Sequence, residues 1–97
     1  MHYPADSKIT RTDQFVETEI DGEIALMNHE TGKFYTLAGT AVRTWQLMQD
    51  GVRVEHVVAS LSREYEVEPL KCLADIQSML GVLERAGLIE VDNNMST

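Results

Sequence analysis

The fold is decided by residues 15–37, which read FVETEIDGEIALMNHETGKFYTL. Its β-branched and aromatic residues stand between acidic ones, which is typical of strands with one solvated face. Asp21-Gly22 is the strongest short hairpin signal in the chain, and a second loop at residues 28–32 ends in Gly32. The stretch predicts a three-stranded antiparallel meander, with strands at 15–20, 23–27 and 33–37.

The chain that follows is helical in pattern. Residues 40–49, 54–65 and 69 to about 86 carry apolar side chains at helical spacing. Pro69 suits the first position of the third helix, and residues 88–91 form a short extended segment. Because a three-stranded sheet of this size is not stable alone, it must pack against the helices. The sequence therefore predicts an α+β fold.

The two ends of the chain show no such pattern. Residues 1–14 are polar and without a period, so we expect a mobile arm, or at most an edge strand. Residues 92–97, DNNMST, are expected to be disordered. A single domain at 15–91 remains, and a chain of 97 residues has no room for a separate cofactor domain.

Charge and composition exclude several functions. The net charge of −8 disfavours nucleic acid and anionic membrane surfaces, which both require a basic face. No apolar run is long enough to span a membrane, and the first residues lack the apolar region of a signal peptide. Cys72 is the single cysteine, which rules out an internal disulfide and suits a reducing, cytoplasmic location.

Residues able to perform catalysis are not grouped in the sequence. The three histidines, His2, His29 and His56, lack metal-ligand spacing, so we expect no metal site. Cys72 lies on an apolar stripe with no base or orienting group nearby, and is expected to be a small buried side chain. No glycine-rich phosphate loop occurs. We therefore expect neither an enzyme nor a cofactor.

The third predicted helix has more apolar surface than one core face needs. One stripe consists of Leu73, Ile76, Leu80 and Leu83, and a second consists of Cys72, Met79, Val82 and Ala86. Asp75 lies within the second stripe. A central helix buried on two sides explains this pattern. So does a helix with one stripe on the core and the other along an open groove, where flexible Met79 and the Asp75 carboxylate would meet a ligand. In the first case Asp75 is a simple exposed carboxylate or bonds to a nearby loop.

The last strand of the predicted meander forms an edge with unpaired backbone groups. Lys33 is its only charged residue, and Phe34 and Tyr35 follow. An extended peptide can add to such an edge as a fourth strand. The alternative is that Phe34 or Tyr35, whichever faces inward, is part of the core.

The order of these elements resembles the PqqD family. The residues that carry the resemblance are Leu26-Met27-Asn28, Thr31 to Leu37, Thr40-Ala41, Trp45, Asp50-Gly51, Leu61, Tyr65-Glu66-Val67, Asp75-Ile76, Leu80, Leu83 and Gly87-Leu88-Ile89. They extend over residues 15–91. Two positions depart from the family pattern. Ala38 replaces an asparagine, so Gly39 or Thr40 must begin the first helix, and Val52-Arg53-Val54 stands where Ser or Thr is usual.

The resemblance implies a winged-helix-like domain, the RiPP recognition element (RiPP: ribosomally made, post-translationally modified peptide). It implies that a leader peptide docks between the third strand and the third helix. Carried over by position, the strand wall consists of Lys33, Phe34, Tyr35, Thr36 and Leu37. The helix wall consists of Cys72, Asp75, Ile76 and Met79, with Val82 and Leu83 at its end.

A leader-binding adaptor is thus the leading hypothesis. It would present the precursor to a separate modifying enzyme: a lasso-peptide leader protease is slightly preferred, a radical-SAM enzyme comes next, and a cyclase is a further possibility. We expect a monomer or weak homodimer. One alternative is a winged-helix DNA-binding regulator, although the third helix offers only Lys71 and Arg85 against Asp75 and Glu84. Another is a small oligomerisation module, formed by edge-strand pairing or arm swapping.

Overall fold

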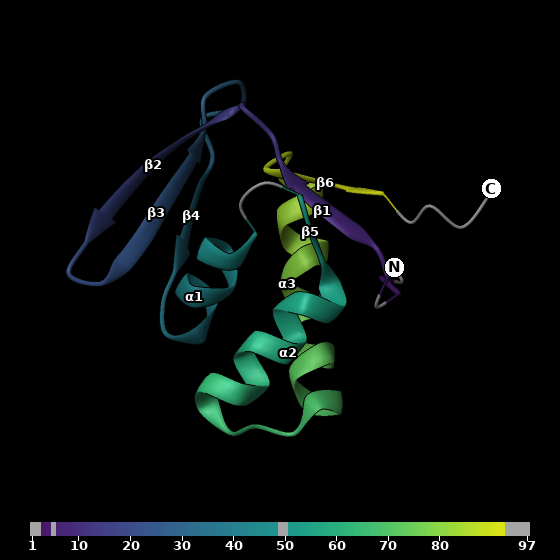
Figure 1. Cartoon of the computed structure of the whole chain (residues 1–97). Helices are drawn as coiled ribbons and strands as arrows, with labels where there is room; N and C mark the ends of the chain where they lie inside the picture. The colour runs from purple at the N-terminus through teal and green to yellow at the C-terminus, as the bar shows by residue number, and fades with distance from the viewer. Residues whose placement is uncertain (1–2, 5, 49–50, 93–97) are drawn as a thin grey trace.

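The computed structural model describes residues 3–4, 6–48 and 51–92, and it contains two small sheets and three helices (Figure 1). The elements in chain order are β1 (Lys8–Arg11), β2 (Phe15–Ile20), β3 (Glu23–Asn28), β4 (Phe34–Leu37), α1 (Thr40–Leu47), β5 (Val52–Arg53), α2 (Val54–Tyr65), α3 (Pro69–Arg85) and β6 (Ile89–Asp92). The predicted α+β class, with a three-stranded antiparallel sheet followed by three helices, is confirmed.

The first sheet is the predicted meander, with strand order β2-β3-β4. Its first turn has positive φ angles at both Asp21 (53°) and Gly22 (82°), as a two-residue hairpin turn requires. Pairing of Ile20 with Glu23 directly follows from that turn. The register then places Leu26 opposite Tyr35, so that both side chains face the helices.

Asn28 fixes the other end of the meander to the end of α3. Its buried side chain donates a hydrogen bond from Nδ2 to the Ala86 carbonyl at 2.7 Å. Its Oδ1 accepts from the backbone N–H of Glu30 at 2.9 Å. One buried amide therefore shapes the β3–β4 turn and holds it against the helical layer.

The second sheet corrects the prediction for residues 1–14. We expected a mobile arm or at most an edge strand, whereas β1 is the central strand of a sheet with order β5-β1-β6. Ile9 pairs with both Val52 and Val91, and its side chain is fully buried. A single buried apolar residue in a four-residue strand produces no alternating pattern, which is why the sequence did not reveal it.

The ends of the helices follow local sequence signals. Gly39 is the N-cap of α1 and has a φ of 62°. No side chain forms a capping hydrogen bond there, so α1 begins without the side-chain cap that an asparagine at position 38 could supply. Pro69 begins α3, as predicted. Helix α1 ends at Leu47, with Met48 as its C-cap, and residue 49 of the predicted helix lies outside the described residues. Asp92, expected in the disordered tail, is instead the last residue of β6, and residues 93–97 of that tail lie outside the described residues.

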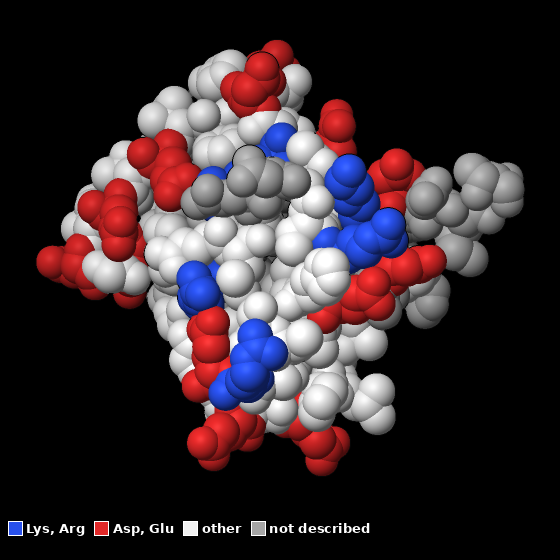
Figure 2. All heavy atoms as spheres, viewed as in Figure 1, with Lys and Arg blue, Asp and Glu red and all other residues white. Residues whose placement is uncertain are grey.

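Charged side chains lie mainly at the surface, and many of them are acidic. Figure 2 shows acidic groups at the outer end of the β2–β3 hairpin, at the left of the view, and along the lower edge. Arg43 on α1 donates two hydrogen bonds, both 2.9 Å long, to the Glu64 carboxylate on α2. These bonds from Arg43 lower the pKa of Glu64. The pair is exposed, so it contributes little to stability.

Candidate functional site

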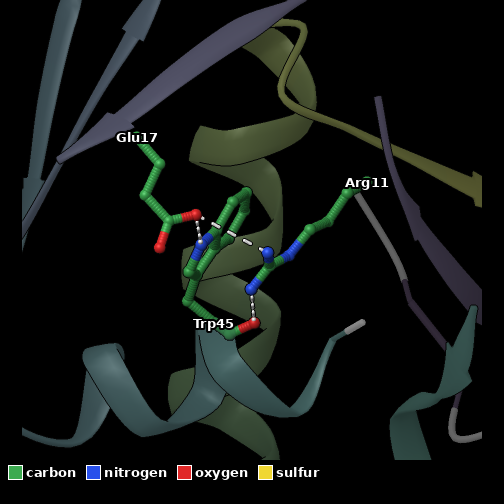
Figure 3. Close-up of polar contacts among 3 residues, drawn as sticks. All are labelled: Arg11, Glu17 and Trp45. Atoms are coloured by element: carbon green, nitrogen blue, oxygen red, sulfur yellow. Dashed lines mark hydrogen bonds and ion pairs between the residues drawn. The ribbon is translucent and has the colours of Figure 1, made fainter. Parts of the chain in front are cut away.

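Trp45 holds the meander beside the helices (Figure 3). Its indole N–H donates to the Glu17 carboxylate of β2 at 3.1 Å. The Arg11 guanidinium of β1 lies over the indole ring, 4.0 Å from its centroid, and also donates to the Trp45 carbonyl. Arg11 Nη1 and Glu17 Oε1 form an ion pair at 3.6 Å. The Phe15 ring packs edge-on against the indole ring, with 5.2 Å between the ring centroids. Strands β1 and β2 and helix α1 therefore meet at one buried side chain.

Strand β4 is one of the two edges of the meander, the other being β2, and the register defines which of its backbone groups are unpaired. Asn28 N–H donates to the Lys33 carbonyl at 3.0 Å, so these two residues form a hydrogen-bonded pair. Bonded and non-bonded pairs alternate along antiparallel strands. The backbone groups of Tyr35 therefore also point toward β3, whereas those of Phe34 and Thr36 point away from it. Two residues of β4 thus present N–H and C=O groups to an incoming strand.

The side chains of β4 divide between two faces. Tyr35 is half-buried and packs against the core, and Leu37 is buried. Of Phe34 and Tyr35, Tyr35 is therefore the one that faces inward and packs against the core, which is the alternative that the sequence left open. Phe34 is 70% exposed and Thr36 is exposed on the opposite face. Lys33 lies one residue before the strand, in the turn.

A pocket of about 280 Å³ opens between the helices. Four residues of the predicted helix wall, Cys72, Asp75, Ile76 and Met79, line it together. Cys72 and Ile76 are buried, Met79 is half-buried, and Asp75 is exposed. Cys72 and Met79 of the second stripe, with Asp75 and with Ile76 of the first stripe, therefore face an open space of a size that accepts one large side chain.

Val82 and Leu83 do not belong to this pocket. Leu83 is 1% exposed and part of the core, because it lies two turns after Ile76 on the stripe that faces inward. Val82 is 46% exposed and does not line the cavity. Leu83 is therefore not accessible to a bound peptide in this structure, whereas a contact between the exposed Val82 and a peptide stays a prediction.

The pocket also has walls that the sequence did not predict. They come from α1, the second half of α2, the α2–α3 connection and the first turn of α3, and are Thr40, Ala41, Thr44, Leu61, Tyr65, Val67 and Lys71. A signal existed, since Thr40 and Thr44, and Leu61 and Tyr65, are pairs four residues apart on single helix faces. No residue of β4 lines the pocket. The edge and the pocket are nevertheless close in sequence, because only Ala38 and Gly39 separate β4 from α1.

The thiol of Cys72 is shielded within this wall. Burial raises its pKa above the usual value, with the nearby Asp75 carboxylate acting in the same direction. At pH 8 the thiolate population is therefore reduced, and the thiolate is the reactive form.

We expect Cys72 to react with 5,5′-dithiobis(2-nitrobenzoate) at pH 8 roughly a hundredfold more slowly in the folded chain than in guanidinium chloride. The absorbance of the released thiol measures both rates. Because Cys72 is the only cysteine, the signal has one source. Equal rates in the two conditions would show that the pocket does not shield this thiol.

Within residues 3–4, 6–48 and 51–92, no group of three or more His, Cys, Asp or Glu side chains is arranged to hold a metal ion. No helix in the same ranges is long and apolar enough to cross a membrane.

A small α+β domain with an open sheet edge and an apolar pocket two residues beyond it belongs to the class of peptide-binding modules. Residues 23–89 match the family of Coenzyme PQQ synthesis protein D (PqqD), and the chain belongs to this family. The resemblance found in the sequence is thereby confirmed. No curated protein matches the chain.

Two solved structures are similar to the chain. The first is TbiB1 in complex with the TbiA(beta) leader peptide, which is 30% identical, with a TM-score of 0.77 over 84% of this chain and 94% of that one. The second is a lasso peptide synthetase B1 complexed with the leader peptide, with 24% identity and a TM-score of 0.74 over 89% of this chain and 99% of that one. At 24% identity, the similarity to this second structure shows the fold alone.

Proposed function

We propose that this chain binds the leader segment of a ribosomally synthesised precursor peptide and presents it to a separate modifying enzyme. The observation that carries the proposal is the edge of β4, where Phe34 and Thr36 direct backbone groups outward. A peptide strand at this edge would gain main-chain hydrogen bonds, the usual source of affinity in strand addition.

The pocket supplies the second part of the recognition. It begins at Thr40, three residues after the end of β4, so an added strand that extends beyond Leu37 reaches the pocket within a few residues. Cys72, Ile76 and Met79 provide an apolar lining, which suits an aromatic or aliphatic anchor. Lys71 and Asp75 are exposed lining residues of opposite charge, one turn apart, and would select polar neighbours of the anchor.

The similar structures support the same reading. TbiB1, at 30% identity, is seen with a leader peptide. A partner in lasso-peptide maturation, with a leader protease as the enzyme, stays our preferred assignment, ahead of a radical-SAM enzyme or cyclase. We propose that the chain acts as a binding protein rather than as a catalyst.

The experiment is isothermal calorimetry with the leader peptide of the precursor encoded beside the gene for this chain. We expect saturable one-to-one binding, and a scrambled peptide of the same composition is the control. Strand addition requires backbone pairing and the pocket requires a particular side chain, so the scrambled peptide should bind far more weakly. No binding of the native leader up to about 100 μM, equivalent to roughly −5.5 kcal/mol, would refute the proposal for that precursor.

The structure does not support the alternative of a DNA-binding regulator. Helix α3 packs against α2 and β6, and five of its residues are buried. Arg85 lies one residue from Glu84, which accepts a hydrogen bond from Tyr3. This helix does not present the basic face that a phosphate backbone requires.

A further inference from the structure

The face of the meander that points away from the helices is apolar. Residues paired directly across antiparallel strands share a face, and the register places Val16 beside Met27 and Met27 beside Phe34. Val16 is 50% exposed and Phe34 is 70% exposed. One row of apolar side chains therefore crosses all three strands on the solvent side. We call this surface, together with Ile20, the outer face.

The neighbouring row on the outer face is also uncharged. It consists of Thr18, Ala25 and Thr36, which are paired in the same register. Beyond it, Ile20 is 60% exposed and borders a shallow hollow near the β2–β3 turn. A sheet with one solvated face normally carries polar residues on that face. An exposed row of apolar side chains beside an uncharged row is a feature of protein-binding surfaces.

Acidic residues border the outer face. Asp21 and Glu23 lie at the hairpin turn and Glu30 lies in the β3–β4 turn. Residues 15–37 contain five acidic residues, against Lys33 as their only lysine or arginine. Figure 2 shows acidic groups gathered at the hairpin end. A complementary surface is apolar with a border of lysine or arginine. A second copy of this chain would instead place like charges opposite each other, which disfavours self-association.

The outer face is continuous with the proposed peptide site. Phe34 belongs to β4, so its side chain lies on the outer face while its backbone groups point to the open edge. A peptide strand paired with β4 would extend the sheet, and its alternate side chains would continue the row formed by Val16, Met27 and Phe34. A protein docked on this face would therefore contact the bound peptide directly.

From this geometry we propose that the outer face docks the enzyme that modifies the bound peptide, through an apolar surface bordered by basic residues. This inference rests on the proposed function, since it assigns a partner to the peptide-loaded domain. It gives peptide capture and enzyme docking separate surfaces: the edge and the pocket hold the peptide, while the opposite side of the same sheet holds the enzyme.

The test uses the double variant Val16→Ser/Ile20→Ser. Both residues lie on β2, which β3 separates from the peptide edge at β4, and both are at least half exposed, so their replacement spares the core. The control is Leu70→Ser, which removes an even more exposed apolar residue, from α3. The probes are the purified peptidase, cyclase or radical-SAM enzymes encoded beside the gene for this chain. Biolayer interferometry measures their binding to the chain with and without the leader peptide.

We expect the double variant to bind its cognate enzyme at least about tenfold more weakly, because apolar anchors dominate such interfaces. It should bind the leader peptide within about twofold of the wild type, and Leu70→Ser should preserve both interactions. Unchanged enzyme binding by the double variant, or no enzyme binding by the wild type, would overturn the docking proposal while leaving peptide binding intact. If the wild type does not bind the leader peptide, the proposed function is refuted instead. A dimer that light scattering detects in the wild type, and that the double variant abolishes, would assign the face to self-association.

Discussion

Replacement of Thr36 by proline is expected to weaken leader-peptide binding by at least about tenfold while the chain remains folded. The N–H of Thr36 points to the open edge, so proline removes a donor that the peptide would use and leaves the pairing with β3 intact. Proline is tolerated at an edge position of this kind. Its ring would also occupy space needed by the incoming strand. Calorimetry with the native leader measures the affinity, and circular dichroism verifies the fold.

Two further variants define the effect. Thr36→Ala removes the side chain and keeps the N–H, so it should bind within about twofold of the wild type if main-chain bonds carry the affinity. Tyr35→Pro removes an N–H that points toward β3, and should destabilise the meander itself. Full peptide affinity in Thr36→Pro would show that the peptide does not pair with β4.

Replacement of Trp45 by alanine is expected to lower the free energy of unfolding by about 3–5 kcal/mol. The side chain is fully buried and is contacted by Phe15, by the Arg11 guanidinium and by the Glu17 carboxylate. Its removal leaves a large cavity where β1, β2 and α1 meet. A domain of this size has a small stability margin, so a substantial unfolded fraction is expected. Urea denaturation followed by far-ultraviolet circular dichroism measures the change.

The conservative variant Trp45→Phe separates packing from hydrogen bonding. It retains an aromatic body but loses the indole N–H, so a smaller loss of about 1–2 kcal/mol is expected. Leu70→Ala is the control, since Leu70 is 75% exposed and should change stability little. A loss below about 1 kcal/mol in Trp45→Ala would contradict the role that the structure gives to this residue.

Local signals were sufficient to predict much of the fold. Asp21-Gly22 and the alternation around it defined the meander, while apolar spacing predicted α2 at 54–65 and Pro69 marked the start of α3. Strands β1 and β5 were not predicted. β5 has two residues, and β1 has one fully buried side chain, Ile9. Neither is long enough to show a period, because their pairing is set by distant partners.

The candidate site could be predicted only in part. The second stripe of α3 located Cys72 and Met79, because helical spacing places them on one side of the helix, whereas Ile76 was assigned to the site through the family resemblance. Spacing does not show where the stripe stops facing open space, so Leu83 was assigned to the pocket although it is part of the core. The Thr40–Thr44 wall was missed because small polar residues on a short helix do not stand out from ordinary surface.

Pairing of β1 with β6 has a consequence for the way this domain can be joined to other proteins. Lys8 lies opposite Asp92, so the first and last strands of the domain are side by side. Both strands are at the right of Figure 1, whereas the meander is at the left. We therefore expect polypeptides fused at either end to attach on the same side of the domain, away from the β4 edge. The domain could then be built into a larger polypeptide from either direction with its binding edge open.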